Sequence, residues 1–370
     1  MKILILAHHA EGLYLPRKEL IMQLKKVGHE VIVSIPKGRC YEKIEALVDK
    51  VIDTPVERRG MNPIKDGKLL LFYAQIINKY RPDCILSYAI KPNLYGGIVG
   101  RFYHVPYIMN ITGLGTAFSR ENIICKVATA LYKLVAGHEQ CVFFQNKGNQ
   151  LILEQHNINW RNPLLVPGSG VNLDAYSYEV YPDDDGVIRF LFVSRILREK
   201  GIYELAEASK KIKKKYSNIE FHVLGKCEDG YEAVMKKWHD DGIFIYHGHQ
   251  SDVKKFIKEA NALVHPSYYP EGMSNVCLEA AATGRPVLTT SDIYGCKETV
   301  DDGITGYKFL SRNVPSLCSA LEAFINLPNT QKIIMGQKAR EKMERQFDRQ
   351  IVIDAYFSEL AKIKVEGVGR

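Results

Sequence analysis

The sequence predicts an α/β protein built from two doubly wound domains. Along the 370 residues, short apolar runs alternate with segments of helical periodicity, and this alternation occurs before and after a connector rich in glycine, proline and aspartate. Such alternation is typical of a parallel sheet covered by helices on both faces. A chain of this length with 46% hydrophobic residues also has enough apolar material for two separate cores.

In the first half, the apolar runs predict strands and the longer periodic segments predict helices. We expect strands at 2–7, 30–35, 84–88, 106–110 and 141–145, and helices at about 16–27, 64–80, 92–103 and 122–137. The segment that contains Ile123, Val127 and Leu134 is amphipathic, and we expect its apolar side to face the core rather than a membrane.

The second half repeats the pattern. We expect strands at 188–194, 219–224, 243–246, 261–264 and 286–290, and helices at 202–216, 230–239, 251–259 and 275–283. A last helical segment at about 331–364 has no strand of its own, and we expect it to pack across both domains. The chain is therefore divided into an N-terminal domain at 1–170, a linker at 171–186, a C-terminal domain at 187–345 and a C-terminal helix at 346–370.

The positive charge of the chain is concentrated in its first half. Residues 1–180 contain 22 Lys and Arg against 15 Asp and Glu, so +7 of the net +8 lies there. A solvated surface, an anionic membrane or lipid diphosphate, and nucleic acid could each explain the excess. No sequence signature of a nucleic-acid-binding domain accompanies the charge, so we expect no nucleic-acid partner.

The cysteines and the start of the chain indicate a reducing compartment. The eight cysteines show no C-x-x-C spacing, which favours free thiols and argues against a structural zinc. The apolar run at 2–7 is too short for a secretion signal, and no stretch approaches the roughly 20 apolar residues that span a bilayer. We therefore expect a cytoplasmic protein. Asp183, Asp184 and Asp185 of the linker are interpreted as solvated acids and not as a metal site.

The segment from Glu271 to Glu279 predicts an anion site at the start of a helix. Ser274 or Asn275 can cap this helix, and Gly284 can end it. The free backbone N–H groups of a helix N-terminus bind phosphate well. We expect Glu271 in the loop and Glu279 in the first turn to contact two parts of an elongated ligand.

Two cations are expected near the same edge of the second sheet. The strand at 188–194 delivers Arg195, and the following loop carries Lys200 into the next helix. A guanidinium binds phosphate bidentately and an ammonium adds a point charge, which suits a diphosphate that leaves as an anion. The loop after the first strand, 7–12, has no G-x-G-x-x-G, and this argues against a nicotinamide oxidoreductase.

Taken together and in order, these motifs resemble family 4 of the retaining glycosyltransferases, which have the GT-B fold of two facing Rossmann-like domains with an interdomain cleft. The resemblance rests on the segments 168–172, 195–201, Gly225, 266–267 and 271–279. The segments 91–97 and 110–115 are most similar to bacterial enzymes of capsule, O-antigen and lipid-linked oligosaccharide assembly. The chain departs from the family in its first loop, which keeps only Gly12, and at Thr112-Gly113, which replaces a histidine of some members.

The resemblance implies roles for the matched residues. Arg195, Lys200 and Glu271 are the expected catalytic residues: the two cations would hold the donor diphosphate, and Glu271 would contact sugar hydroxyls. Glu279 would bind the ribose. The remaining expected donor-binding residues are Gly12, Gly225, Lys226, His249, Met273, Ser274, Asn275 and Val276, and the expected acceptor-binding residues are Lys91, Tyr95, Thr112 and Gly113.

The reaction implied by the resemblance is a front-face sugar transfer with retention, without a metal or another cofactor. The donor would be a nucleotide sugar, by default UDP-linked, and the acceptor a lipid-diphosphate-linked saccharide on the inner face of the bacterial plasma membrane. A nucleotide-sugar epimerase or a phosphorylase on the same scaffold is the alternative enzyme, and an inactive nucleotide-sugar-binding scaffold is the alternative of another class.

Overall fold

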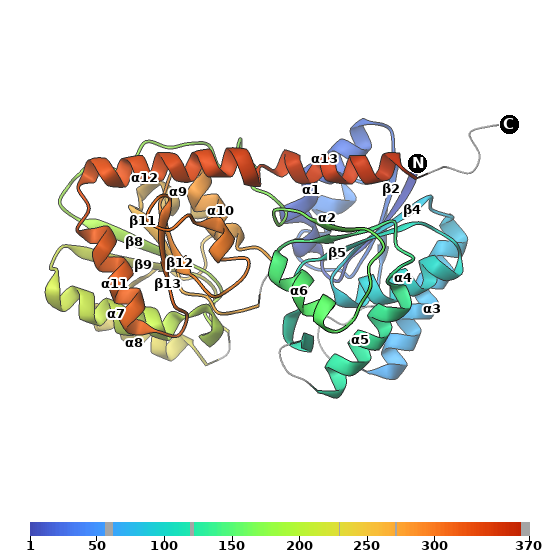
Figure 1. The fold of residues 1–370 in the computed structure, drawn as a ribbon, viewed down its shortest axis with the longest axis horizontal. Helices are drawn as coiled ribbons and strands as arrows, with labels where there is room; N and C mark the ends of the chain where they lie inside the picture. Colours follow the sequence, from blue (N-terminus) through green and yellow to red (C-terminus); the bar gives the residue numbers. More distant parts are fainter. Residues whose placement is uncertain (56–61, 119–121, 229, 271, 364–370) are drawn as a thin grey trace. The chain divides into compact units, whose positions relative to one another are not determined.

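The computed structural model describes residues 1–55, 62–118, 122–228, 230–270 and 272–363. The chain forms two compact units, one of 1–169 with 351–370 and one of 170–350 (Figure 1). The segment at 171–186, expected as a linker, is thus part of the second unit. The helical residues from Ile351 onward belong to the first unit.

The first unit is a parallel sheet of seven strands in the order β3-β2-β1-β4-β5-β6-β7. The order reverses between β1 and β4, where Ile3 lies opposite Val31 on one side and Cys84 on the other. Ligands of doubly wound proteins bind outside the carboxyl ends of the strands at such a reversal. The strands are β1 (Lys2–Leu6), β2 (Glu30–Ile35), β3 (Lys50–Asp53), β4 (Cys84–Tyr88), β5 (Tyr107–Ile111), β6 (Cys141–Phe144) and β7 (Pro163–Leu165).

Helices cover both faces of this sheet. One face packs against α1 (Ala10–Lys26), α2 (Tyr41–Glu45) and the part of α13 (Arg349–Ala361) that belongs to this unit. The other packs against α3 (Pro63–Tyr80), α4 (Ile90–Phe102), α5 (Ile123–Val135) and α6 (Lys147–Gln155), as Figure 1 shows. Because both faces are covered, the central strands are buried along their whole length, which explains their continuous apolar runs.

The first helix begins earlier than predicted. The helix was expected to start near residue 16, but α1 begins at Ala10 with His9 as its N-cap. The ring of His9 accepts a hydrogen bond from the Gly12 N–H at 2.7 Å. Pro16 has no N–H to donate to the Gly12 carbonyl, and the guanidinium of Arg17 donates to it instead, at 3.1 Å.

The second unit is a parallel sheet of six strands in the order β10-β9-β8-β11-β12-β13, which reverses between β8 and β11. Its strands are β8 (Ile188–Val193), β9 (Ile219–Leu224), β10 (Ile245–Tyr246), β11 (Ala262–His265), β12 (Val287–Thr290) and β13 (Gly306–Phe309). One face carries α7 (Ile202–Lys215), α8 (Glu232–Asp240) and α11 (Val314–Ile325). The other carries α9 (Val253–Glu259), α10 (Asn275–Ala282) and α12 (Asn329–Lys342). The predicted α/β class and double winding are confirmed in each unit.

The last helical segment is interrupted. α12 continues into a π-helical turn, Met343–Phe347, and the chain leaves the helical conformation at Asp348 before α13. Val171 donates a backbone hydrogen bond to Phe347 and accepts one from Arg349, at 2.8 and 3.0 Å. A Cβ on Gly170 would lie 2.4 Å from the Arg349 Cα, so a glycine is required there. The interruption therefore lets the segment at 170–171 pair with the chain at 347–349.

Candidate functional site

A tight turn after β8 positions the two expected cations. Arg195 follows the strand, and Lys200 ends a 3-10 turn, Arg198–Lys200, just before α7. Gly201 has a φ of 76°, and a Cβ there would lie 2.2 Å from the carbonyl oxygen of Pro266. The glycine thus lets the turn pack against the end of β11. As a consequence the side chain of Lys200 is buried and only 7% exposed.

Arg195 and Lys200 meet at one aromatic ring. The Arg195 Cζ lies 5.8 Å and the Lys200 Nζ 5.1 Å from the centroid of the Tyr269 ring. Arg195 also forms an ion pair with Glu228, with 2.9 Å between Nη1 and Oε1. Burial, assisted by the nearby charge of Arg195, lowers the pKa of Lys200 to about 8. Two cations held close together, one of them away from water, form a site that an anion would stabilise.

The start of α10 lies at the same place. Burial raises the pKa of Cys277, in the first turn of α10, to about 11, and the positive charge of Lys200 acts in the opposite direction. Ser274 occupies the N-cap position, although its hydroxyl makes no capping hydrogen bond. Gly284, with a φ of 82°, follows the C-cap and ends the helix as predicted. Met273 is buried and Asn275 is exposed, so only the latter offers its side chain to solvent.

Glu279 is the fifth residue of α10 and therefore lies in its second turn, not in the first as expected. Its carboxyl is partly buried, and burial raises its pKa to about 7. A hydrogen bond from Tyr176 and the charges of Arg349 and Lys254 act against this rise. The pKa of the Glu279 carboxyl is thus close to neutral pH. Glu271 lies outside the described residues.

His265, at the end of β11, is a buried neutral residue. It is 1% exposed, and neither ring nitrogen has a hydrogen-bond partner among the described residues. Burial, assisted by the charge of Lys200, lowers the pKa of His265 to about 3. The residue is therefore part of the core next to Lys200.

A second part of the site lies at the ends of β9 and β10. Gly225 has a φ of 154°, and a Cβ there would lie 1.7 Å from the carbonyl oxygen of Ser194, so β9 can end against β8 only with glycine. The Gly225 N–H donates to the Gly248 carbonyl at 2.8 Å, and the Tyr246 hydroxyl donates to the Gly225 carbonyl at the same distance. The segments at 225–226 and 247–249, which contain the expected donor-binding residues Gly225, Lys226 and His249, are therefore adjacent.

A pocket of about 370 Å³ opens beside these two segments. Lys226 and His249 were predicted to belong to the site, whereas the other lining residues were not. The pocket is lined by Lys226, Cys227, Glu232, Lys236, His239, Tyr246 and His249. Its walls combine an aromatic ring, two lysines and an acid, which is a suitable lining for a polar planar group.

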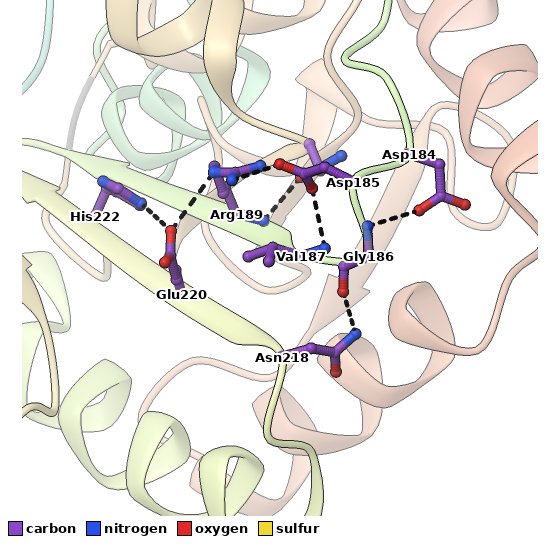
Figure 2. A network of polar contacts seen from close by, with 9 residues as sticks. Asp184, Asp185, Gly186, Val187, Arg189, Asn218, Glu220 and His222 are labelled. Carbon is purple, nitrogen blue, oxygen red and sulfur yellow. Dashed lines mark hydrogen bonds and ion pairs between the residues drawn. The ribbon is translucent and has the colours of Figure 1, made fainter.

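A chain of polar contacts runs from the turn before β8 along the first half of β9 (Figure 2). The rings of His222 and His247 are joined by a contact of 3.0 Å between Nδ1 and Nε2. His222 also contacts Glu220 at 3.0 Å, and Arg189 pairs with both Glu220 and Asp185. The contact with His222 holds the ring of His247, which is the residue before Gly248. Asp184 and Asp185 accept backbone hydrogen bonds from Gly186 and Val187, which gives these acids a role in the turn before β8.

The candidate residues of the first unit are more dispersed. Lys91, in the first turn of α4, forms an ion pair of 2.7 Å with Asp66. Burial and the charge of Asp66 raise the pKa of Tyr95 to about 12, so Lys91 and Tyr95 lie around the same carboxylate. Thr112 and Gly113 follow β5 and are partly buried. The Gly12 N–H, an expected donor-binding group, donates its hydrogen bond to the ring of His9.

Sequence reasoning missed a buried polar network at the ends of β4 and β5. The Asn93 side-chain amide donates to the Asn110 carbonyl at 2.9 Å, and the Asn110 amide donates to the Ser87 carbonyl at 3.1 Å. The Ser87 hydroxyl donates to Asn93, and the Tyr356 hydroxyl contacts Asn110. Asn93 and Asn110 lie in the segments 91–97 and 110–115, which carry the similarity to enzymes of capsule and O-antigen assembly. That similarity was the feature of the sequence that could have pointed to these two residues.

In the described ranges, no group of three or more His, Cys, Asp and Glu side chains is arranged to hold a metal ion. All eight cysteines are free thiols. Two doubly wound sheets, with a cation pair and a helix N-terminus at the strand ends of the second, define an α/β protein with two Rossmann-like units.

The comparisons with known proteins identify the family. Residues 2–146 match the model described as "Glycosyl transferase 4-like", and residues 179–342 match "Glycosyl transferases group 1". The capsular polysaccharide biosynthesis glycosyltransferase CapM of Staphylococcus aureus is 31% identical over 354 residues, which cover 89% of each chain. The chain therefore belongs to the family 4 type of glycosyltransferases, which have the GT-B fold.

Two further proteins are similar over nearly their full length. The N,N'-diacetylbacillosaminyl-diphospho-undecaprenol alpha-1,3-N-acetylgalactosaminyltransferase of Campylobacter jejuni is 24% identical, with 96% of this chain and 97% of the relative covered. The crystal structure of Anabaena Alr3699/HepE in complex with UDP and glucose superposes with a TM-score of 0.79 at 17% identity, and covers 98% of this chain and 100% of that one. The structural likeness confirms the GT-B type of fold.

Proposed function

We propose that the protein transfers a hexose or an N-acetylhexosamine from a UDP-linked donor to a lipid-diphosphate-linked saccharide, with retention and without a metal. The observation that carries the proposal is the pair of cations, Arg195 and Lys200, at the Tyr269 ring beside the start of α10. Two side-chain cations and a helix N-terminus provide the positive field that a departing diphosphate needs.

The donor would extend from this cation pair along the strand ends. Glu279, when ionised, would accept hydrogen bonds from the ribose hydroxyls, and the pocket beside Lys226 and His249 would hold the base. Glu271 is proposed to contact the hydroxyls of the transferred sugar. UDP as the nucleotide is supported by the complex named for Alr3699/HepE.

In the proposed mechanism, the bond between the sugar and the diphosphate breaks first, and the acceptor hydroxyl attacks the same face of the resulting oxocarbenium-like centre. Negative charge grows on the diphosphate as the bond breaks, and Arg195 and Lys200 stabilise that charge more in the transition state than in the bound donor. The departing diphosphate takes the proton of the acceptor hydroxyl. A carboxylate nucleophile is not required in this sequence of events.

The acceptor class is supported by the relatives. The C. jejuni relative and an Escherichia coli galactosyltransferase, 24% identical over 314 residues, are both named for diphosphoundecaprenol-linked substrates. The charge of +7 in residues 1–180 suits an anionic lipid surface. We assign the acceptor to the first unit, near Lys91, Tyr95, Thr112 and Gly113, and the protein to the cytoplasmic face of the membrane. None of the helices within the described residues is long and apolar enough to cross a bilayer.

A transfer assay tests the proposal. Purified protein is incubated with a panel of UDP-sugars and an undecaprenyl-diphosphate-linked saccharide, and the product is analysed by mass spectrometry and by NMR of the new glycosidic bond. We expect one sugar to be added with the anomeric configuration of the donor. Conversion of the donor without acceptor would instead identify an epimerase, and an inverted linkage would contradict the mechanism.

A further inference from the structure

Helix α5 carries an exposed apolar ridge. Ile123 is 80% exposed, Leu134 is 52% exposed and Val127 is 39% exposed. At 100° per residue, these three side chains lie within about 40° of one another around the helix axis. The opposite side of α5 is buried in the unit through Cys125, Ala128, Tyr132 and Val135. The expectation that the apolar side faces the core is therefore wrong for half of this helix, since both of its sides are apolar.

Two lysines run along one flank of the ridge. Lys126 and Lys133 are seven residues apart, so they lie on one side of α5, about 90° from the centre of the ridge. α5 contains no acidic residue, and neither lysine has an ion pair among the described residues. Together with Thr129, Ala130, Cys125 and His156, they line a pocket of about 220 Å³. The flank is therefore positively charged and hollowed.

The neighbouring end of α4 extends the same surface. α4 and α5 lie side by side in the first unit (Figure 1), and the guanidinium of Arg101 donates to the Leu134 carbonyl at 2.7 Å. Phe102, the next residue, is 74% exposed. A third cation, Arg101, therefore lies at the C-terminal end of the ridge.

This combination fits a lipid bilayer better than a protein partner. Helices that lie in a membrane interface carry large apolar residues on one side and lysines on the flanks, where the ammonium groups reach the lipid phosphates. Lysine is instead depleted in protein–protein interfaces. The concentration of positive charge in residues 1–180 further favours an anionic surface.

We propose that α5 is a docking surface for an anionic phospholipid bilayer. Ile123, Val127 and Leu134 lie at the boundary between headgroups and acyl chains, and Lys126 and Lys133 contact the lipid phosphates. This surface deepens the proposed function, because it would hold the protein at the membrane that contains its acceptor. It does not depend on which sugar is transferred.

Vesicle co-sedimentation of the full-length protein tests the proposal. The wild type is compared on phosphatidylglycerol/phosphatidylcholine vesicles and on pure phosphatidylcholine vesicles, with the triple variant I123S/V127S/L134S and the double variant K126Q/K133Q. The triple variant should lose at least tenfold in affinity. The double variant should lose roughly 25-fold on anionic vesicles, at about fivefold for each lysine, and also most of its salt dependence. I304S, which removes an exposed apolar residue of the second unit, is the matched control and should bind like the wild type.

Two readouts separate this proposal from others. UDP binding, followed by thermal stabilisation, should be unchanged in the triple variant, which shows that it is folded and that the donor site is independent of α5. Unaltered vesicle binding in the triple variant, or absence of binding by the wild type, would overturn the docking surface whether or not transfer activity is found. Loss of a wild-type dimer in the triple variant, measured by analytical ultracentrifugation, would assign the ridge to a second copy of the chain instead.

Discussion

The buried ammonium of Lys200 makes a quantitative prediction about the replacement Lys200→Met. Burial lowers the pKa of Lys200 from the ordinary value of 10.5 to about 8. At about 1.4 kcal/mol for each pKa unit, the charged form is disfavoured in the folded state by about 3 kcal/mol. Lys200 is charged in the folded and the unfolded chain at pH 7, so the whole penalty applies there. The penalty shrinks as pH rises above 8 and vanishes above 10.5.

Methionine fills a similar volume without a charge, so Lys200→Met should raise the unfolding free energy of the second unit at pH 7. We expect a gain of about 1–3 kcal/mol, because the contacts of the ammonium are lost together with its penalty. The same variant should lose at least about thirtyfold in turnover, equivalent to about 2 kcal/mol, since the charge that stabilises the leaving diphosphate is missing. A variant that gains stability and loses activity indicates that the charge it removes serves function at a site shielded from water.

Urea unfolding at pH 7 and pH 10 measures the stability, and initial rates of sugar transfer measure the activity. Lys211→Met, which removes an exposed lysine from α7, is the matched control and should change neither quantity appreciably. The gain for Lys200→Met should be smaller at pH 10 than at pH 7. A variant that is less stable than the wild type at pH 7 and retains its turnover would refute the reasoning.

Other predictions concern the remaining site groups. Arg195→Ala should lower turnover at least about thirtyfold with little effect on the KM of the acceptor, as steady-state rates would show. The pKa of Glu279, raised to about 7 by burial, predicts that calorimetric uridine affinity increases from pH 6 to pH 8 as the carboxylate forms, whereas Glu279→Gln should lack this increase. Because the pKa of His265 is lowered to about 3, the folded protein should lose about 1.4 kcal/mol for each pH unit below 6.5, and urea unfolding of His265→Leu between pH 7 and pH 5.5 should lack this loss. Transfer should persist in excess EDTA; restoration by magnesium after a loss would contradict the metal-free mechanism.

Much of the fold could be predicted because most of its strands are buried on both faces. Such strands appear in the sequence as continuous apolar runs. The strands that the sequence did not reveal, β3, β7 and β13, have partly exposed residues and therefore no such run. The start of α1 was placed too late, because only the structure shows that His9 caps the helix and that Arg17 satisfies the carbonyl that Pro16 leaves. Both sides of α5 carry apolar residues, so the sequence did not indicate which side packs against the sheet.

The site could be predicted where it is built from short motifs. Arg195, Lys200 and Glu279 could be proposed as site residues because their spacing to strand and helix ends is local in sequence. Tyr269, which contacts both cations, and Glu228, which pairs with Arg195, come from other loops and are brought near only by the fold. No sequence pattern marks Tyr269 or Glu228 as residues of the site. The pKa values of Lys200 and Glu279 likewise depend on burial that the sequence does not show.

The central claim is that Arg195 and Lys200 form the diphosphate site of a nucleotide-sugar donor, and isothermal titration calorimetry of UDP against uridine tests it most directly. Charge-assisted hydrogen bonds from cations to phosphate are strong, so UDP should bind the wild type at least 100-fold more tightly than uridine. In the double variant Arg195→Ala/Lys200→Met, most of this difference should disappear while uridine affinity stays the same. Equal affinities of the wild type for UDP and uridine, or an unchanged preference for UDP in the double variant, would contradict the claim.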